Sequence, residues 1–427
     1  MAGFFLGALA LALPLHAGAP APEEGRVALV ASKILTCSFE GEQVVDHGVV
    51  LIREGKIEAV GRVGEVEIPE GYQTIDYGDL WLSPGFVGLH SHEAGASLFS
   101  GVNDLNDTVY LANPGMRAAA SVEPGNHSME MAVAGGVTTI LYIPGSGSNI
   151  GGQGVLLKTP FTTFEEKVVR NPGSMKLAQW GNPERWGPGV GMAFENWNTR
   201  NTFRRGIVYA RQMERAAAGE AEELPRNISF DPWRDLVRGE MAVSTHTQVY
   251  QVVLMTLTMI REELDMPVFL DHSTIGGWLA GKLAKELGVS AIVGPRSVDA
   301  LSRGFINWAR NKHEGFRGNA AGYQEMGMEM IGFNTDAPII PQEELSVQAA
   351  MGARYGMTDE RMQILRGLTI VPAITAKIGD RVGSIEVGKD ADILVVDGHP
   401  ADPRTHMEST WVNGKLVYDA KRDGRRW

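Results

Sequence analysis

Five side chains of this sequence, four histidines and one aspartate, are of the types that bind metal ions in proteins. His90 and His92 are one residue apart. Because alternate residues of a β-strand point to the same side, a strand here would aim both imidazoles at one point. His246, His272 and Asp336 follow much later in the chain. Imidazole nitrogens suit zinc, iron, cobalt, nickel or manganese, and a carboxylate adds a hard oxygen ligand. We therefore expect a divalent ion from this group, with zinc favoured among these metals and with one or two ions as the alternatives.

All five residues stand at the ends of predicted strands. The strands predicted for residues 241–246, 267–272 and 330–336 end at the later three, and residues 84–92 end in the histidine pair. A single histidine at a strand end is more often a hydrogen-bonded core residue than a metal ligand. Five candidates at matching strand ends carry much more weight.

The middle of the chain, residues 81–378, alternates between strands and helices. The predicted helices are 201–218, 249–263, 279–287, 345–355 and 359–369. This α/β alternation fits a (β/α)₈ barrel of the TIM type, in which chemistry takes place at the C-terminal ends of the strands. A doubly wound sheet is the alternative, but the glycine-rich first turn typical of that fold is missing.

Both ends of the chain are rich in short strands with turn signals between them. We expect residues 22–80 and 379–427 to form one small β-sandwich domain. Residues 1–21 hold an apolar run followed by small residues, which predicts a signal peptide and a periplasmic or secreted protein, although no Lys or Arg precedes the run. No later segment has eighteen consecutive apolar residues, so we expect no membrane span.

Composition narrows the classes of partner. The chain has 427 residues, 44% of them hydrophobic, and a net charge of −12. An acidic chain without basic clusters binds nucleic acid poorly, so the expected partner is a small-molecule substrate. The single cysteine, Cys37, allows neither an intrachain disulfide nor a cysteine metal site, and we expect it to be buried in a strand. The oligomeric state stays open, with a homo-oligomer as one option.

Several segments resemble the amidohydrolase superfamily, and together they span nearly all of the chain after residue 21. Residues 84–92 (PGFVGLHSH) resemble the signature of its first barrel strand. Residues 382–396 (VGSIEVGKDADILVV) resemble the return into its small β domain, and residues 411–418 (WVNGKLVY) are similar to the strand that ends many members. Residues 144–154 (PGSGSNIGGQG) look like the branch related to imidazolonepropionase and prolidase-like amidohydrolases.

The resemblance implies both ligands and a reaction. It implies His90, His92, His246 and His272 as metal ligands, and Asp336 as a ligand and the general base. The implied reaction is hydrolysis of a carbon–nitrogen bond in an amide or cyclic amide, dipeptides included, by metal-activated water. If a single ion is bound, one of the two later histidines would instead stabilise the oxyanion.

Two features of the resemblance concern the details of the site. Members with two metals use a bridging carboxylated lysine or a glutamate, and the candidates here are Lys176, Lys158 and Glu195, of which we favour Lys176. Members usually carry an aspartate two residues before the first histidine, whereas this chain has Gly88. That change would alter how His90 is oriented.

A Gly/Ser loop predicted for residues 144–154 follows a strand end and should border the site. Its backbone N–H groups could bind a substrate carboxylate, with Gly145, Ser146, Gly152 and Gln153 as candidates, or the loop could be a flexible connection. Two other functions remain open. One is a deaminase or lactone hydrolase on the same fold, and the other is a non-catalytic assembly protein, which we disfavour because such proteins lack several ligands.

Overall fold

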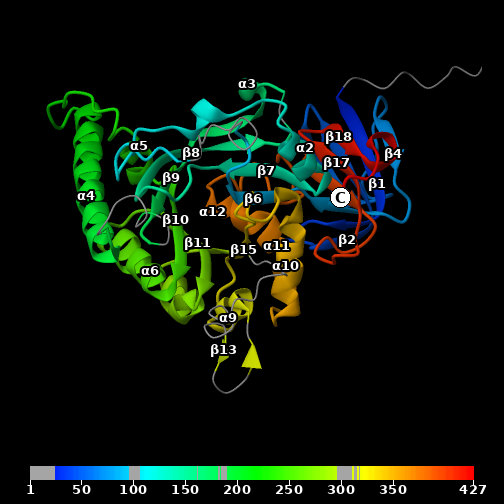
Figure 1. Cartoon of the computed structure of the whole chain (residues 1–427). Coiled ribbons are helices and arrows are strands. Elements are labelled where there is room, and N and C mark those ends of the chain that lie inside the picture. The colour runs from blue at the N-terminus through cyan, green and yellow to red at the C-terminus, as the bar shows by residue number, and fades with distance from the viewer. Residues whose placement is uncertain are drawn as a thin grey trace, which may run out of the picture.

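The computed structural model describes residues 25–95, 106–160, 162–180, 183, 190–295, 310–311, 315–316 and 318–427. The predicted signal peptide, residues 1–21, lies outside this part of the chain. Two large sheets dominate the molecule, one in the barrel and one in a smaller domain beside it (Figure 1). Within the described ranges, no helix is both long and apolar enough to cross a membrane.

The barrel sheet has eight strands in the order β15-β12-β11-β10-β9-β8-β7-β6. Its strands are β6 (Phe86–Ser91), β7 (Val137–Tyr142), β8 (Ile150–Lys158), β9 (Val168–Ala178), β10 (Ala242–Val249), β11 (Val268–Ile275), β12 (Ala291–Val293) and β15 (Ile331–Phe333). The first and last strands approach each other where Ser91 bridges Ala337, so the barrel is nearly closed. The predicted barrel is therefore confirmed, and the doubly wound alternative is excluded.

One barrel strand runs against the others. β8 pairs antiparallel with both β7 and β9, whereas the remaining barrel neighbours pair in parallel. The loop predicted for residues 144–154 consequently ends early, because residues 150–154 lie in β8. The reversal also places the first residues of β8 at the mouth of the barrel and its last residue, Lys158, at the base, opposite Thr139 near the start of β7.

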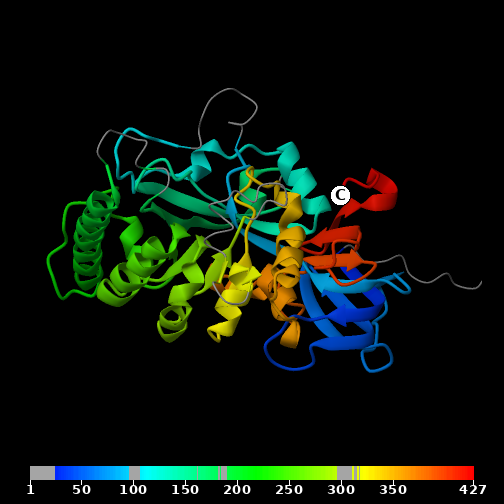
Figure 2. The same ribbon diagram turned by 60° about the horizontal axis from the view of Figure 1, so that its bottom comes forward.

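Helices cover the outside of the barrel (Figures 1 and 2). They are η1 (Ala118–Ser121), α2 (His127–Ala134), α3 (Phe164–Lys167), α4 (Met192–Ala217), α5 (Pro232–Val237), α6 (Tyr250–Met255), η3 (Thr256–Glu263), η4 (Gly277–Ala280), α7 (Gly281–Glu286), α9 (Asn319–Glu325), η5 (Gln342–Glu344), α10 (Leu345–Arg354), η6 (Glu360–Met362), α11 (Gln363–Leu368) and α12 (Ile370–Thr375). The helix predicted for residues 249–263 appears as α6 continuing into η3. A short pair, β13 (Arg310–Asn311) and β14 (Gly315–Phe316), lies apart from the large sheets.

The longest helix shows how sequence spacing directs packing. Phe203, Ile207 and Ala210 of α4 are three or four residues apart, so they share one face, and all three are buried. The ring of Phe203 meets Trp233 of α5 edge-on, with 5.4 Å between the centroids. The predicted helix 201–218 extends further than expected and begins at Met192.

The smaller domain combines both ends of the chain, as predicted. Its strands are β1 (Arg26–Leu35), β2 (Val44–Arg53), β3 (Lys56–Arg62), β4 (Gln73–Asp76), β5 (Trp81–Pro84), β16 (Ile393–Val396), β17 (Met407–Val412) and β18 (Lys415–Asp419), followed by helix α13 (Ala420–Asp423). They form one hydrogen-bonded sheet, in the order β18-β17-β16-β5-β1-β2-β3, with β4 beside β1. Because β5 pairs with β1 and β16, this sheet continues past residue 80.

A buried ion cluster joins the base of the barrel to the smaller domain. The ammonium of Lys158 at the end of β8 contacts the carboxylates of Asp392 and of Asp390, the latter at 3.1 Å. Lys56 and Arg381 also pair with Asp390. Since Lys158 is 1% exposed, it relies on these carboxylates in place of water.

Candidate metal centre

The structure brings His90, His92 and Asp336 together at the barrel mouth. His90 and His92 come from the end of β6, and Asp336 follows β15. The Nε2 atom of His90 lies 3.0 Å from Oδ1 of Asp336 and 3.0 Å from Nε2 of His92. Nε2 of His92 lies 3.5 Å from the same carboxylate oxygen. The seam where β15 meets β6 holds the two ends in register, because the N–H of His92 donates to the carbonyl of Ala337 at 2.8 Å.

The two later histidines complete the cluster. The ring of His272 lies 4.4 Å from that of His90 and 4.4 Å from that of His246, between ring centroids. Ligand atoms of His90, His272 and Asp336 all lie within 4.8 Å of one another, as atoms sharing one ion must. All five predicted residues thus meet at one site, drawn from the ends of four strands.

Each histidine uses its Nδ1 atom for support and presents Nε2 to the site. Nδ1 of His90 contacts Oδ2 of Asp271, and the Nδ1–H groups of His92 and His272 donate to the carbonyls of Ile143 and Gly294, both at 2.8 Å. Such partners fix the tautomer that leaves the Nε2 lone pair available to a metal.

Nδ1 of His246 lies 2.9 Å from the Ser146 hydroxyl. The Nε2 atoms of His246 and His272 are buried without a hydrogen-bond partner among the described residues. Buried polar atoms are rarely left in this state. A donor set of imidazole nitrogens and one carboxylate fits a divalent transition ion.

Two supporting residues, Asp271 and Asn334, escape prediction from the sequence. The amide of Asn334 donates to Oδ1 of Asp271 at 2.9 Å and to the carbonyl of Ile292 at 2.7 Å, so it fixes the carboxylate that holds His90. All three side chains are buried. Asp271 immediately precedes His272, and in a regular strand neighbours point to opposite faces. Alternation therefore argued against a shared role.

The backbone departs from regular strand geometry at these positions. His272 has φ 70°, Ser273 φ 51° and Asp336 φ 50°. Positive φ is uncommon for residues other than glycine and concentrates at functional sites, where the surrounding structure holds it in place. The turn in the chain at His272 explains how successive residues of β11 serve the same cluster.

Lys176 is the fully buried cation of the site. It lies on β9 opposite Ser244 of β10, two residues before His246. The side chain has no exposed surface, and its Nζ has no hydrogen-bond partner in the part of the chain that the structure describes. Burial lowers the pKa of the Lys176 ammonium, because the charged form loses its hydration.

Burial and mutual contact also set the charges of the ligands. Burial lowers the pKa of His272 to about 4 and that of His246 well below its usual value. Burial also opposes protonation of His90, but the Asp271 carboxylate outweighs it and raises the pKa. For Asp336 burial acts upward, yet His90 and His272 hold its pKa below the usual range. Neutral imidazoles beside an ionised carboxylate are the protonation states that bind metals.

The other candidates lie in different surroundings. Lys158 is at the barrel base in its ion cluster, and Glu195 is buried on α4. Gly152 pairs with Lys176 across β8 and β9. Gln153, the next residue of β8, donates its amide to Pro114 O at 3.1 Å and its N–H to Met116 O at 2.8 Å.

Gly145 and Ser146 lie in the loop before β8, and a Cβ at Gly145 would meet Asn106 at 2.4 Å. Ser146 contacts His246 as described. A Cβ at Gly88 would lie 2.6 Å from the amide nitrogen of Gln342, which is buried beside it. The space that an aspartate side chain would enter at position 88 is thus filled by Gln342. Asp271 of β11 orients His90 instead.

Comparisons with known proteins agree with this geometry. The sequence model of the amidohydrolase family matches residues 276–419, which include Asp336. An amidohydrolase from Thermotoga maritima MSB8 has a solved structure that is 26% identical, with a TM-score of 0.78, covering 92% of this chain and all of that one. The chain is therefore similar to amidohydrolases over nearly its whole length.

Two further proteins resemble this chain. The amidohydrolase tasK of Hapsidospora irregularis is 27% identical over 403 residues. The match covers 87% of this chain but only 40% of that relative, so the chain spans less than half the length of tasK. A prolidase complexed with N-methylphosphonate-L-proline is 16% identical, with a TM-score of 0.55, covering 92% of this chain and all of that one. At that identity the likeness concerns the fold alone.

Proposed function

We propose that this protein is a metal-dependent hydrolase that cleaves a carbon–nitrogen bond of an amide or cyclic amide in a small molecule. The observation that carries the proposal is the set of four Nε2 atoms and one carboxylate gathered at the barrel mouth, with His246 Nε2 and His272 Nε2 buried and otherwise unpartnered in the described chain. Two relatives above 25% identity bear the name amidohydrolase, which supports the bond type.

A divalent ion held by these side chains would polarise the scissile carbonyl and lower the pKa of a water molecule to about 7. Asp336 has the position and the charge of a general base, because its Oδ1 faces both His90 and His92 and its pKa is held low. It would take a proton from the attacking water and return it to the leaving nitrogen. An amide nitrogen leaves poorly unless protonated, so the second transfer matters as much as the first.

Lys176 is proposed as the residue that lets the site hold a second ion. Its lowered pKa favours the neutral amine, which can add to carbon dioxide with formation of an N–C bond and release of one proton. The product, a carbamate, carries two oxygen ligands in place of a buried positive charge. Support comes from its complete burial and the absence of a partner for Nζ among the described residues. If one ion is bound instead, His246 or His272 would stabilise the oxyanion.

Removing the histidine pair tests the metal site. The variant H90A/H92A should lose bound metal, measured by mass spectrometry of the purified protein, and should lose turnover. His127 is a matched control, because its exposed side chain lies on α2 away from the cluster. H127A should keep the metal content of the unaltered protein. Unchanged metal in H90A/H92A would overturn the proposed centre.

A substrate panel tests the bond that is cut. Dipeptides, N-acyl amino acids, cyclic amides, aminopurines and lactones should be compared at equal metal load. We expect turnover of at least one amide or cyclic amide, abolished in H90A/H92A. Turnover of aminopurines or lactones alone would replace the amide assignment with a deaminase or lactonase. Metal-loaded protein inactive on the whole panel would favour the non-catalytic alternative.

Export through residues 1–21 is also proposed, on the apolar run and the small residues that follow it. The N-terminal sequence of the mature protein, purified from its native host, would show cleavage after this segment. An intact Met1 would remove the proposal.

A further inference from the structure

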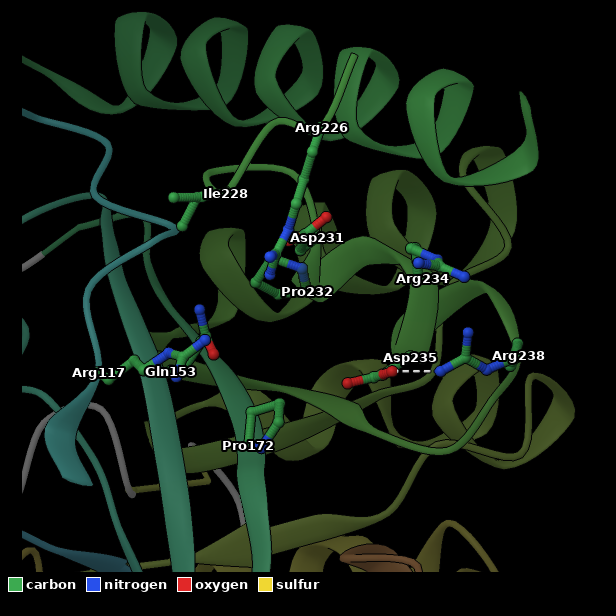
Figure 3. Close-up of a pocket in the computed structure, with 10 residues that line it drawn as sticks. All are labelled: Arg117, Gln153, Pro172, Arg226, Ile228, Asp231, Pro232, Arg234, Asp235 and Arg238. Atoms are coloured by element: carbon green, nitrogen blue, oxygen red, sulfur yellow. Dashed lines mark hydrogen bonds and ion pairs between the residues drawn. The ribbon is translucent and has the colours of Figure 1, made fainter. Parts of the chain in front are cut away.

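A second cavity lies on the outer side of the barrel, away from the metal centre. It has a volume of about 280 Å³ and is bounded by β8, β9 and the segment around α5 (Figure 3). Its lining residues are Arg117, Gln153, Pro172, Arg226, Ile228, Asp231, Pro232, Arg234, Asp235 and Arg238. Gln153 lines this cavity, whereas Gly152 before it pairs with Lys176, and successive residues of a strand face opposite sides. One strand therefore separates the two sites.

Four of the ten lining residues are arginines, and only two are acidic. Both aspartates are already engaged. Asp231 accepts from Arg226 at 2.8 Å and from the Tyr209 hydroxyl at 3.0 Å. Asp235 pairs with Arg238, the contact drawn in Figure 3. Glu214, which lies outside the lining, also pairs with Arg234 and Arg238, both at 3.0 Å. Arg117 is therefore the lining arginine without an acidic partner among the described residues.

Arg117 and Arg234 keep hydrogen-bonding capacity. Arg117, at the start of η1, is exposed, and its side chain makes no hydrogen bond or ion pair with the residues that the structure describes. Arg234 uses only its Nε, which donates to Glu214 at 3.0 Å, so both terminal nitrogens stay available. In Figure 3, Arg117 lies with Gln153 on one side of the cavity, and Arg234 lies on the other with Arg238.

We propose that this cavity binds a small molecule with two anionic charges, a dicarboxylate or a phosphate, between Arg117 and Arg234. A guanidinium presents paired N–H donors in a planar fork that matches carboxylate and phosphate oxygens. Two such groups facing one cavity fit an anion at each end or a dianion between them. The buried Gln153 closes one wall with a neutral amide and adds no opposing charge.

Calorimetric titration of the metal-loaded protein at low ionic strength tests this. The probes are succinate, inorganic phosphate and succinamide, the uncharged analogue of succinate. We expect succinate or phosphate to bind and succinamide not to bind. Whichever anion binds more tightly identifies the preferred group. Failure of both anions, or equal binding of succinamide, would overturn the proposal.

Variants then locate the bound anion. R117A and R234A should each weaken binding by about 10-fold or more, and R117K should weaken it as well because lysine lacks the fork. R211A is the control, since Arg211 is an exposed arginine of α4 outside the cavity. If the anion binds at the metal instead, its affinity will be the same in R117A, R234A and the unaltered protein, and that result would refute the assignment to this cavity. The proposed hydrolase activity does not depend on either outcome.

Discussion

Two buried lysines on neighbouring strands lie in different electrostatic surroundings. Lys158 of β8 lies at the barrel base between Asp390 and Asp392. Lys176 of β9 lies at the mouth with no partner for Nζ among the described residues. Both are at most 1% exposed. The paired lysine connects two parts of the fold, whereas the lysine without a hydrogen-bond partner is available to a ligand or a modification. Burial alone does not tell these roles apart.

The largest effect should follow from removing the paired lysine. K158M leaves the carboxylates of Asp390 and Asp392 buried near each other, which typically costs about 3–5 kcal/mol of folding free energy. Chemical unfolding of K158M and the unaltered protein measures the difference. The double variant K158M/D392N should recover part of the loss. If K158M is as stable as the unaltered protein, the ion pairs of Lys158 do not stabilise the fold, and the two lysines do not differ in this way.

Lys176 should show the reverse profile. K176M should lower kcat by about 10²–10³, as loss of one group that acts on the transition state does. It should leave the unfolding free energy unchanged or raised, because a buried amine whose Nζ has no hydrogen-bond partner among the described residues is replaced by an apolar chain of similar length. Metal content should fall toward one ion per chain. Strong destabilisation with full activity would make Lys176 a structural residue.

Changing Asp271, which positions the candidate ligand His90, should have a smaller effect. D271N keeps the shape of the side chain but weakens its hold on His90, so zinc affinity should fall by about 10–100-fold. Competition with a chelator of known affinity measures it. D265N is the control, since Asp265 is an exposed aspartate paired with Arg261. Equal affinities in both variants would show that Asp271 does not position His90.

Two buried carboxyl groups, those of Glu93 and Asp390, differ in the same way, and they should make folding stability depend on pH in opposite directions. Burial, followed by the neighbouring Glu343, raises the pKa of Glu93 to about 7. A raised pKa in the folded state means that stability is fully present below pH 4.5 and is lost as pH rises through 7. E93Q should therefore be more stable than the unaltered protein at pH 8, by up to about 3 kcal/mol, and equal to it near pH 4.

At the barrel base, stability changes with pH in the opposite direction. Burial acts to raise the pKa of Asp390, but Lys158 and its other cations outweigh burial and lower the pKa. Stability from Asp390 is therefore present above the pKa of a free aspartate and is lost as pH falls through the lowered value.

Urea unfolding of E93Q and the unaltered protein at pH 4, 6 and 8 measures the predicted effect of Glu93 on stability. A stability difference that stays constant with pH would contradict it.

The sequence predicts the barrel from the alternation of strands and helices and the small domain from the strand-rich chain ends. It predicts the five residues of the centre from their positions at strand ends. Strand ends of a barrel converge, so residue type plus strand position is enough to bring His90, His246 and Asp336 together. The same rule applied to Lys158 is misleading, because the direction of β8 is invisible in its composition. Lys158 also ends a strand, but that end lies at the base.

The residues that position the ligands could not be predicted, because their placement departs from the regular alternation of side chains along a strand. Asp271 contributes only because the backbone turns at His272, where φ is 70°. Asn334 acts through Asp271, because its amide donates to Asp271 and to the carbonyl of Ile292 and to none of the candidate ligands. Ser146 was expected near the substrate, and its contact is with His246; its predicted substrate role remains a prediction.

The reversed strand has a consequence for how the chain reaches its fold. Through β8, the barrel pairs Tyr142 with Val155, residues close together in sequence, whereas the β6–β7 pair joins Phe86 to Val137. Closing a short loop costs less chain entropy than closing a long one, so local pairings form sooner. We expect the meander β7–β8–β9 to assemble early, with β6 and β15 meeting last at the seam beside His92. The metal centre would then become complete only when the barrel closes.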